Sequence, residues 1–174
     1  MLYVSKLDIY KNQLKIISVI NYLKKKFDIT LSLIGSYDKK NKKILLNEIK
    51  KYNLSKNIKI LGKIDYHKLP KIYHKHDIKI YASKSETFGM TMLEAIKSGL
   101  PVLAIKNQIS KEILSEAGFF CYNSTKNIQN TILKIINNKK LLKKKIILGK
   151  KIAEKYNWKI TSKKTFNFLE KVRG

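Results

Sequence analysis

Short runs of consecutive apolar residues alternate with longer segments whose apolar residues recur at helical spacing. An uninterrupted short apolar run is typical of a strand that helices cover on both faces. In the longer segment of residues 12–26, for example, Leu14, Ile17, Ile20 and Leu23 recur on one side. The predicted strands are residues 2–5, 29–34, 58–61, 78–82, 101–105 and 119–122.

The alternation predicts a doubly wound α/β fold. Strands that are separated by helices favour parallel pairing, with helices on both faces of one sheet of about six strands. Beyond residue 122 the pattern is helical only, which predicts a helical C-terminal tail. Ligands of such sheets bind outside the carboxyl ends of the strands. The predicted helices are residues 12–26, 39–52, 67–76, 88–98, 127–137, 139–156 and 158–172.

The chain of 174 residues is long enough for one domain with its own core. Its single cysteine, Cys121, has no partner for an internal disulfide, which favours a reducing compartment. No apolar stretch approaches the ~20 residues of a membrane span, and no signal peptide is recognisable at the start. We therefore expect a cytoplasmic domain. Because the first predicted strand starts at residue 2, either the fold starts abruptly or an upstream segment is absent.

The formal net charge of +26 would ordinarily indicate nucleic acid or an anionic membrane as a partner. All but one of the 38 basic residues are lysine, however, and Arg173 is the exception. Proteins that bind nucleic acid use arginine for bidentate hydrogen bonds to guanine and phosphate. An excess of lysine is instead what an AT-rich coding sequence would produce. We therefore expect no specific nucleic acid, while the charge still favours peripheral contact with the inner face of an anionic membrane. A basic module that binds RNA or anionic lipid is the alternative function.

One turn of the chain is flanked by two carboxylates, Glu86 and Glu94. Ser85, Thr87 and Gly89 let the backbone of this turn approach a ligand, and the first N–H groups of a following helix favour an anion. If the stretch between the two carboxylates were helical, their Cα atoms would be roughly 12 Å apart, too far for a hydrolytic pair at about 5–9.5 Å. A nucleotide sugar, with phosphate between two hydroxyl-rich rings, suits this layout. An ordinary helix of an α/β protein is the alternative interpretation.

Residues 77–102 resemble the signature of the family 4 retaining glycosyltransferases, or glycosyl transferases group 1. The shared pattern is an acidic residue, seven residues, a second acidic residue followed by alanine, and a strand that starts Gly-x-Pro-Val. These enzymes are of the GT-B type, with two Rossmann-like domains. The resemblance therefore implies a Rossmann-like three-layer sandwich for this chain.

A second resemblance lies at the N-terminus, in residues 3–12. It is to the first strand of the donor domain, with Lys6 in place of the usual arginine and Lys11 at the second basic position. Ser5 and Asn12 replace two glycines of the family pattern. Because lysine lacks the planar fork of arginine, we expect looser phosphate geometry than is usual in the family.

The resemblance implies a role for each matching residue. Glu94 would accept hydrogen bonds from the ribose hydroxyls, and Glu86, as a catalytic residue, would hold hydroxyls of the donor sugar. Lys6 and Lys11, the other implied catalytic residues, would stabilise the departing diphosphate. No metal and no cofactor are implied, and the donor would be a UDP-, GDP- or ADP-sugar. The remaining residues implied to bind the nucleotide sugar are Thr87, Phe88, Gly89, Met90 and Thr91 around the diphosphate, Lys63 near the base, and Gly35 at the end of the second strand.

The resemblance covers residues 2–172 but only the C-terminal, donor-binding half of the enzyme. We expect residues 1–174 to form a single nucleotide-sugar-binding domain that lacks the N-terminal acceptor domain or works with a separate acceptor-binding chain. The last predicted helix resembles the one that crosses back to the acceptor domain, so Trp158 and Phe166 would lack part of their contact surface.

The complete enzyme would transfer a hexose to a glycan or lipid acceptor in the synthesis of cell-envelope or surface polysaccharide. The chain alone would bind the nucleotide weakly and transfer little or nothing, because the reacting groups lie between two domains. A noncatalytic or regulatory α/β domain that kept the fold is a third interpretation.

Overall fold

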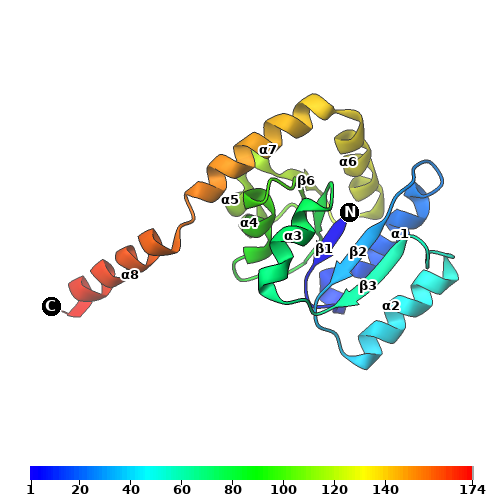
Figure 1. Ribbon diagram of the computed structural model, residues 1–174, viewed down its shortest axis with the longest axis horizontal. Coiled ribbons are helices and arrows are strands. Elements are labelled where there is room, and N and C mark those ends of the chain that lie inside the picture. Colours follow the sequence, from blue (N-terminus) through cyan, green and yellow to red (C-terminus); the bar gives the residue numbers. More distant parts are fainter. Residues whose placement is uncertain (174) are drawn as a thin grey trace.

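Six parallel strands form one sheet in the computed structural model, which describes residues 1–173 (Figure 1). Their spatial order is β3-β2-β1-β4-β5-β6. Strands β1 to β3 therefore form one half of the sheet, β4 to β6 form the other half, and β1 and β4 are neighbours at the centre. The predicted parallel sheet is thereby confirmed. The strands are β1 (Leu2–Val4), β2 (Leu31–Ile34), β3 (Ile58–Gly62), β4 (Lys79–Tyr81), β5 (Val102–Ile105) and β6 (Phe119–Cys121).

Residues 1–173 also form eight α-helices and three 3-10 turns. The first six helices each follow one strand, as right-handed crossovers between parallel strands require. The helices are α1 (Gln13–Leu23), α2 (Lys39–Lys51), α3 (Leu69–His74), α4 (Met90–Lys97), α5 (Gln108–Leu114), α6 (Thr125–Asn137), α7 (Lys139–Glu154) and α8 (Trp158–Arg173). The 3-10 turns are η1 (Ile9–Lys11), η2 (Tyr66–Lys68) and η3 (Ser115–Ala117).

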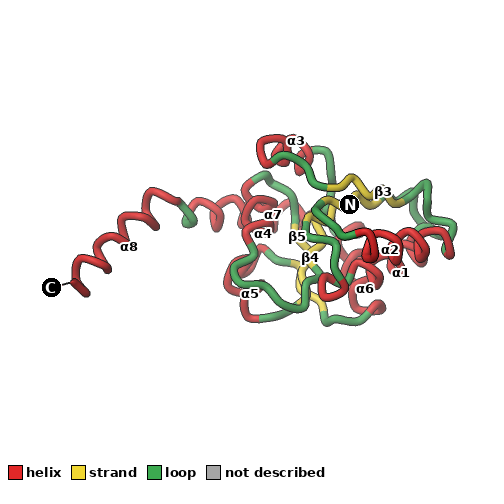
Figure 2. Tube along the Cα trace, turned by 90° about the horizontal axis from the view of Figure 1, so that it is seen from below, coloured by secondary structure: helices red, strands yellow, loops and turns green. Residues whose placement is uncertain are grey.

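Two apolar cores lie on the two faces of the sheet, which gives the predicted three layers (Figure 2). Helices α1, α2 and α6 cover one face, and α3, α4 and α5 cover the other. Strand side chains alternate between the cores: Ile78 and Ile80 join the first core, and Tyr81 joins the second. The near-continuous apolar runs of the sequence reflect this burial on both faces.

The helix behind the carboxylate turn starts later than predicted. The sequence pattern predicts a helix over residues 88–98, whereas α4 begins at Met90. Gly89 precedes it in the left-handed conformation, at φ 82°, so Phe88 lies outside the helix. The helical estimate of roughly 12 Å between the flanking carboxylates therefore does not apply to the turn, because only the part from Met90 to Glu94 is helical.

The sheet reverses its direction of growth between β1 and β4, which are hydrogen-bonded neighbours. In open α/β sheets this reversal leaves a ligand-binding crevice at the carboxyl ends of the two strands. Two hydrogen bonds fix the loops there: Lys84 N–H donates to the Tyr10 carbonyl at 3.0 Å, and the Asn12 amide donates to the Ala82 carbonyl at 2.7 Å. The carboxylate turn therefore lies against the β1–α1 loop.

The last helix, α8, extends away from the sheet and its covering helices (Figures 1 and 2). It buries none of its described residues. Trp158 is 75% exposed and Phe166 is 69% exposed, values unusual for such large apolar side chains. None of the helices in residues 1–173 is long and apolar enough to cross a membrane.

Candidate functional site

The turn between β4 and α4 exposes the N-terminus of a helix at the carboxyl edge of the sheet. The first N–H groups of α4, at Met90 and Thr91, have no partner within the helix and point back toward the turn, as at every helix start. The space behind Gly89 is filled, because an added Cβ would lie 2.5 Å from the Met92 methyl group and 3.5 Å from the Tyr81 hydroxyl. The left-handed φ of 82° favours glycine there, while the contact with the Met92 methyl group could be relieved by a shift of that flexible side chain.

Glu86 is held by a lysine from the other side of the switch point. The Lys11 ammonium forms an ion pair with Glu86 Oε1. The Lys11 side chain is only 8% exposed and lies 4.7 Å above the ring of Tyr10, while Glu86 is 22% exposed. The Lys11 carbonyl accepts a hydrogen bond from the Tyr3 hydroxyl, which anchors this lysine to β1. The structure therefore brings together two residues that the sequence assigned to the site separately.

Glu94 is held in a different way, by a phenol. The Tyr73 hydroxyl donates a hydrogen bond of 2.7 Å to Glu94 Oε2. Tyr73 comes from α3 and is 1% exposed. Burial and the Glu94 carboxylate both raise the pKa of the Tyr73 phenol, so it remains a donor at all physiological pH values. Within residues 1–173 only Oε2 of this carboxylate accepts a hydrogen bond, so Oε1 can accept one from a ligand.

Glu94 also lines a cavity of about 420 Å³. The wall of the cavity is mostly apolar and aromatic, and Phe88 packs edge-to-face on Tyr156 with ring centroids 6.3 Å apart. A volume of this size suits a small organic ligand. The residues that line it are Tyr66, Phe88, Met90, Leu93, Glu94, Lys97, Ala153, Tyr156, Asn157, Trp158 and Thr161.

The sequence also assigned Lys6, Lys63 and Gly35 to the site, and none of these three lines the cavity. Lys6 is 55% exposed and pairs with Asp8 at 3.4 Å. Lys63 is exposed at the end of β3. Gly35 packs against the loop after β1, where an added Cβ would be 1.8 Å from the Ser5 carbonyl oxygen. Their roles in ligand binding stay predictions.

The sequence analysis missed two residues beside the site: Tyr73, which contacts Glu94, and Lys79, whose amine lies beside the Tyr73 ring. Lys79 is the first residue of strand β4 and is completely buried. Burial lowers its pKa to about 7, although the carboxylates of Glu94 and Glu86 act in the opposite direction. The sequence did contain a signal for Lys79, because a lysine between two isoleucines of a predicted buried strand indicates a buried amine. Tyr73 offered none, because its contact with Glu94 depends on the placement of α3.

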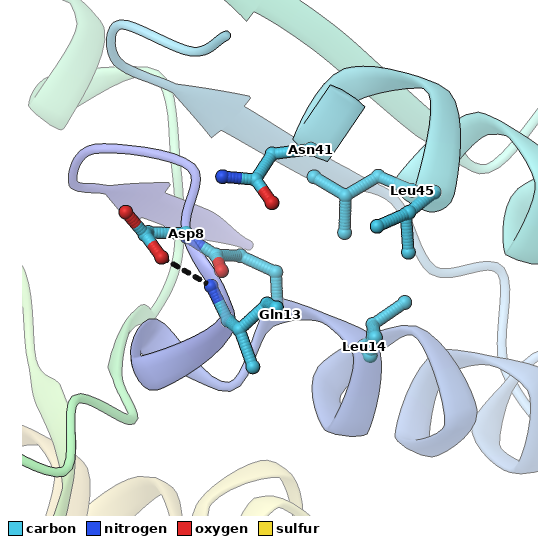
Figure 3. Close-up of a pocket in the computed structure, with 7 residues that line it drawn as sticks. Asp8, Gln13, Leu14, Asn41 and Leu45 are labelled. Atoms are coloured by element: carbon cyan, nitrogen blue, oxygen red, sulfur yellow. Dashed lines mark hydrogen bonds between the residues drawn. The ribbon is translucent and has the colours of Figure 1, made fainter. Parts of the chain in front are cut away.

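A second cavity lies between the β1–α1 loop and α2 (Figure 3). It measures about 20 Å³, which is room for a single water molecule. Asp8 and Gln13 border it, and an Asp8 carboxylate oxygen accepts a hydrogen bond of 2.7 Å from the Ile9 N–H. This cavity is too small for an organic ligand. Within residues 1–173 no group of three or more His, Cys, Asp or Glu side chains could hold a metal ion.

Comparison with known proteins gives the family. A family model described as Glycosyl transferases group 1 matches residues 1–152 of the chain. The chain belongs to this family. The predicted family resemblance is confirmed, and with it the assignment to the C-terminal domain of a GT-B enzyme.

Individual glycosyltransferases of the group show how much of the enzyme is present. An uncharacterized glycosyltransferase of Methanocaldococcus jannaschii is 31% identical over 137 residues, which cover 77% of this chain and 38% of that protein. The C-terminal domain of the group 1 protein LpcC from Francisella tularensis is 27% identical with a TM-score of 0.75, covering 88% of this chain and 84% of that one. HepE of Anabaena, solved with UDP and glucose, has the same fold at a TM-score of 0.90 and 21% identity, covering 98% of this chain and 47% of that one. The chain thus spans less than half of the longer relatives.

Proposed function

We propose that this chain binds a nucleotide sugar as the donor half of a retaining hexosyltransferase. The observation that carries the proposal is the Glu94 carboxylate in the wall of the 420 Å³ cavity, four residues beyond the N-terminus of α4. An acceptor for hydroxyl groups therefore lies beside a position that favours phosphate. The relative from Anabaena was solved with UDP and glucose, which supports the same class of ligand here.

The proposed arrangement gives the diphosphate, the ribose and the sugar a partner each. The diphosphate lies at the N-terminus of α4, against the backbone from Phe88 to Thr91. The ribose hydroxyls donate to Glu94, whose second oxygen is already occupied by Tyr73. The hydroxyls of the sugar donate to Glu86, which the ion pair with Lys11 orients.

In the transfer, the bond between the sugar C1 and the diphosphate oxygen breaks, and C1 forms a bond to a hydroxyl oxygen of the acceptor. Negative charge then accumulates on the diphosphate, where the α4 dipole and the Lys11 ammonium stabilise it. In the same reaction the acceptor hydroxyl gives its proton to the departing diphosphate oxygen. The acceptor, a glycan or lipid of the cell surface in this proposal, would be bound by the other half of the enzyme.

Helix α8 supports the need for that other half. Trp158, Phe166, Phe168, Leu169 and Val172 are all more than half exposed, and their spacing places them on one side of the helix. An apolar helix face of this kind is stabilised by covering it. Because the chain spans only 38% of its archaeal relative, the proposed cover is the acceptor domain, in the same or a separate chain.

Calorimetry with UDP, GDP and ADP tests the proposal. We expect one of these nucleotides to bind, and we expect Glu94→Gln to weaken that binding at least about tenfold, since hydrogen bonds to a charged group contribute about 1.5–3 kcal/mol. Glu112→Gln is the matched control: it makes the same chemical change on the exposed surface of α5 and should leave affinity unchanged. Failure of all three nucleotides to bind at millimolar concentration would contradict the proposal.

The high positive charge supports the second candidate, a module for RNA or anionic lipid. Binding to a polyanion is expected to fall steeply as salt rises if it reflects charge alone. Polyanion binding that persists at 0.2 M salt and survives the Glu86→Gln and Glu94→Gln double change would favour this candidate.

A further inference from the structure

Strand β4 carries two polar side chains that are buried without a hydrogen-bond partner within residues 1–173. They are the Lys79 amine and the Tyr81 hydroxyl. Because they are two residues apart on a strand, both project from the same face, toward α3 and α4. An amine that is completely buried and unpaired is costly to the fold and calls for a functional explanation.

Lys79 has apolar neighbours on the flanking strands and polar neighbours on the helix-covered face of the sheet toward which it projects. Its register partners on the flanking strands are Leu2 of β1 and Val102 of β5. Helix α3 contributes Tyr73, whose ring centroid lies 5.5 Å from Lys79 Nζ. The charged groups that act on the amine are the Glu94 carboxylate from α4 and the Glu86 carboxylate from the turn.

Lys79 is therefore next to the proposed donor site without lining it. Tyr73 bridges the two, because its ring lies beside the Lys79 amine while its hydroxyl holds Glu94. Strand β4 also leads directly into the turn before α4, where the diphosphate would bind. Any new negative charge at this turn favours the protonated form of a nearby buried amine.

We infer that Lys79 is a positioning residue that couples donor binding to the uptake of one proton. In the free domain the amine is largely neutral above pH 7, and when an anionic nucleoside diphosphate binds, it takes a proton from solvent and becomes an ammonium. The new positive charge on Lys79 then partly compensates the negative charge of the diphosphate and of the Glu86 and Glu94 carboxylates. This inference rests on the proposed function, because it requires an anion at the start of α4.

The alternative is that Lys79 only fills space beneath α3 and α4. Its aliphatic stem resembles that of methionine, so Lys79→Met preserves the packing and removes only the amine. A structural role would leave proton uptake unchanged in this variant.

The test is calorimetry of UDP binding at pH 8 in several buffers that differ in ionisation enthalpy. The slope of the observed enthalpy against the buffer enthalpy gives the number of protons taken up. At pH 8 the terminal phosphate of UDP is already ionised, because its pKa is about 6. We expect a slope of about one proton for the wild type, as a group with a pKa near 7 is about 90% neutral at pH 8.

Lys79→Met should bind UDP with a slope near zero, whereas Lys111→Met, a matched change at an exposed lysine of α5, should keep the wild-type slope. An equal slope in the wild type and in Lys79→Met would overturn the inference. Circular dichroism and a melting curve establish that each variant is folded.

A second measurement needs the wild type alone, so it holds even if Lys79→Met does not fold. If one proton is taken up, UDP affinity should fall by up to about tenfold per pH unit between pH 7.5 and 9. A flat profile over this range would overturn the inference while leaving the proposed function intact. If the wild type binds no nucleoside diphosphate at all, both the inference and the proposed function fail.

Discussion

Glu86 and Glu94 lie on either side of the same turn, yet the fold holds them by different means. Glu86 forms a direct ion pair with Lys11, a lysine that arrives from the β1–α1 loop. Glu94 accepts a hydrogen bond from the neutral phenol of Tyr73, with the amine of Lys79 behind it. The first carboxylate is thus paired with a cation, whereas the second is held by a neutral hydroxyl at one of its two oxygens. In the proposed function, Glu86 binds the sugar and Glu94 binds the ribose.

The largest expected effect concerns the pH dependence of folding at Lys79. Its pKa is about 7 in the folded chain and 10.5 in the unfolded chain, so between these values the unfolded state binds more protons. Stability should therefore rise with pH in this window, by about 1.4 kcal/mol per pH unit, or about 3 kcal/mol between pH 7 and 9.5. Urea unfolding of the wild type and of Lys79→Met at these two pH values measures the effect.

The increase in the free energy of unfolding between pH 7 and 9.5 should be absent in Lys79→Met and present in Lys111→Met. If Lys79→Met gained stability with pH as steeply as the wild type does, the buried amine would not be the group that titrates.

The next effect sharpens the contrast between the two lysines near the turn. Lys11→Met leaves Glu86 without a partner at a site that is largely screened from water, which should lower the free energy of unfolding by about 2 kcal/mol. Lys6→Met removes an exposed pair with Asp8 and should change it by less than about 0.5 kcal/mol. Urea unfolding at pH 7 compares them, and equal losses would show that the Lys11–Glu86 pair is no stronger than a surface pair.

The smallest expected effect is at the phenol that holds Glu94. Tyr73→Phe keeps the buried ring and removes one hydrogen bond to a carboxylate, so it should lower the free energy of unfolding by about 1 kcal/mol. Tyr122→Phe is the control, since that tyrosine is 66% exposed. A thermal melt resolves the difference, and identical melting temperatures for the two variants would mean that the Tyr73 hydroxyl contributes nothing to stability.

The sequence pattern was sufficient for the sheet, whereas the roles of the site residues stay predictions. An uninterrupted apolar run such as the one in β5 indicates a strand that is covered on both faces, because such a strand exposes no side chains to water. Glu86 and Glu94 likewise lie on either side of the start of α4, because both belong to one local segment. Local patterns of this kind can be recognised without knowledge of tertiary contacts.

Contacts between distant segments could not be predicted in this way. The Lys11–Glu86 pair joins residues 75 positions apart and exists because β1 and β4 are neighbours in the sheet. The Tyr73–Glu94 hydrogen bond depends on how α3 lies against α4. The start of α4 was misplaced by two residues because helical periodicity continues through Phe88, whereas the backbone of Gly89 prevents a helix there.

The central claim, that this chain binds a nucleotide donor through Glu94, is tested most directly by calorimetry of UDP binding to the wild type, Glu94→Gln and Glu112→Gln. We expect the wild type and Glu112→Gln to bind with equal affinity and Glu94→Gln to bind at least about tenfold more weakly. Equal affinity in all three proteins would contradict the assignment of Glu94.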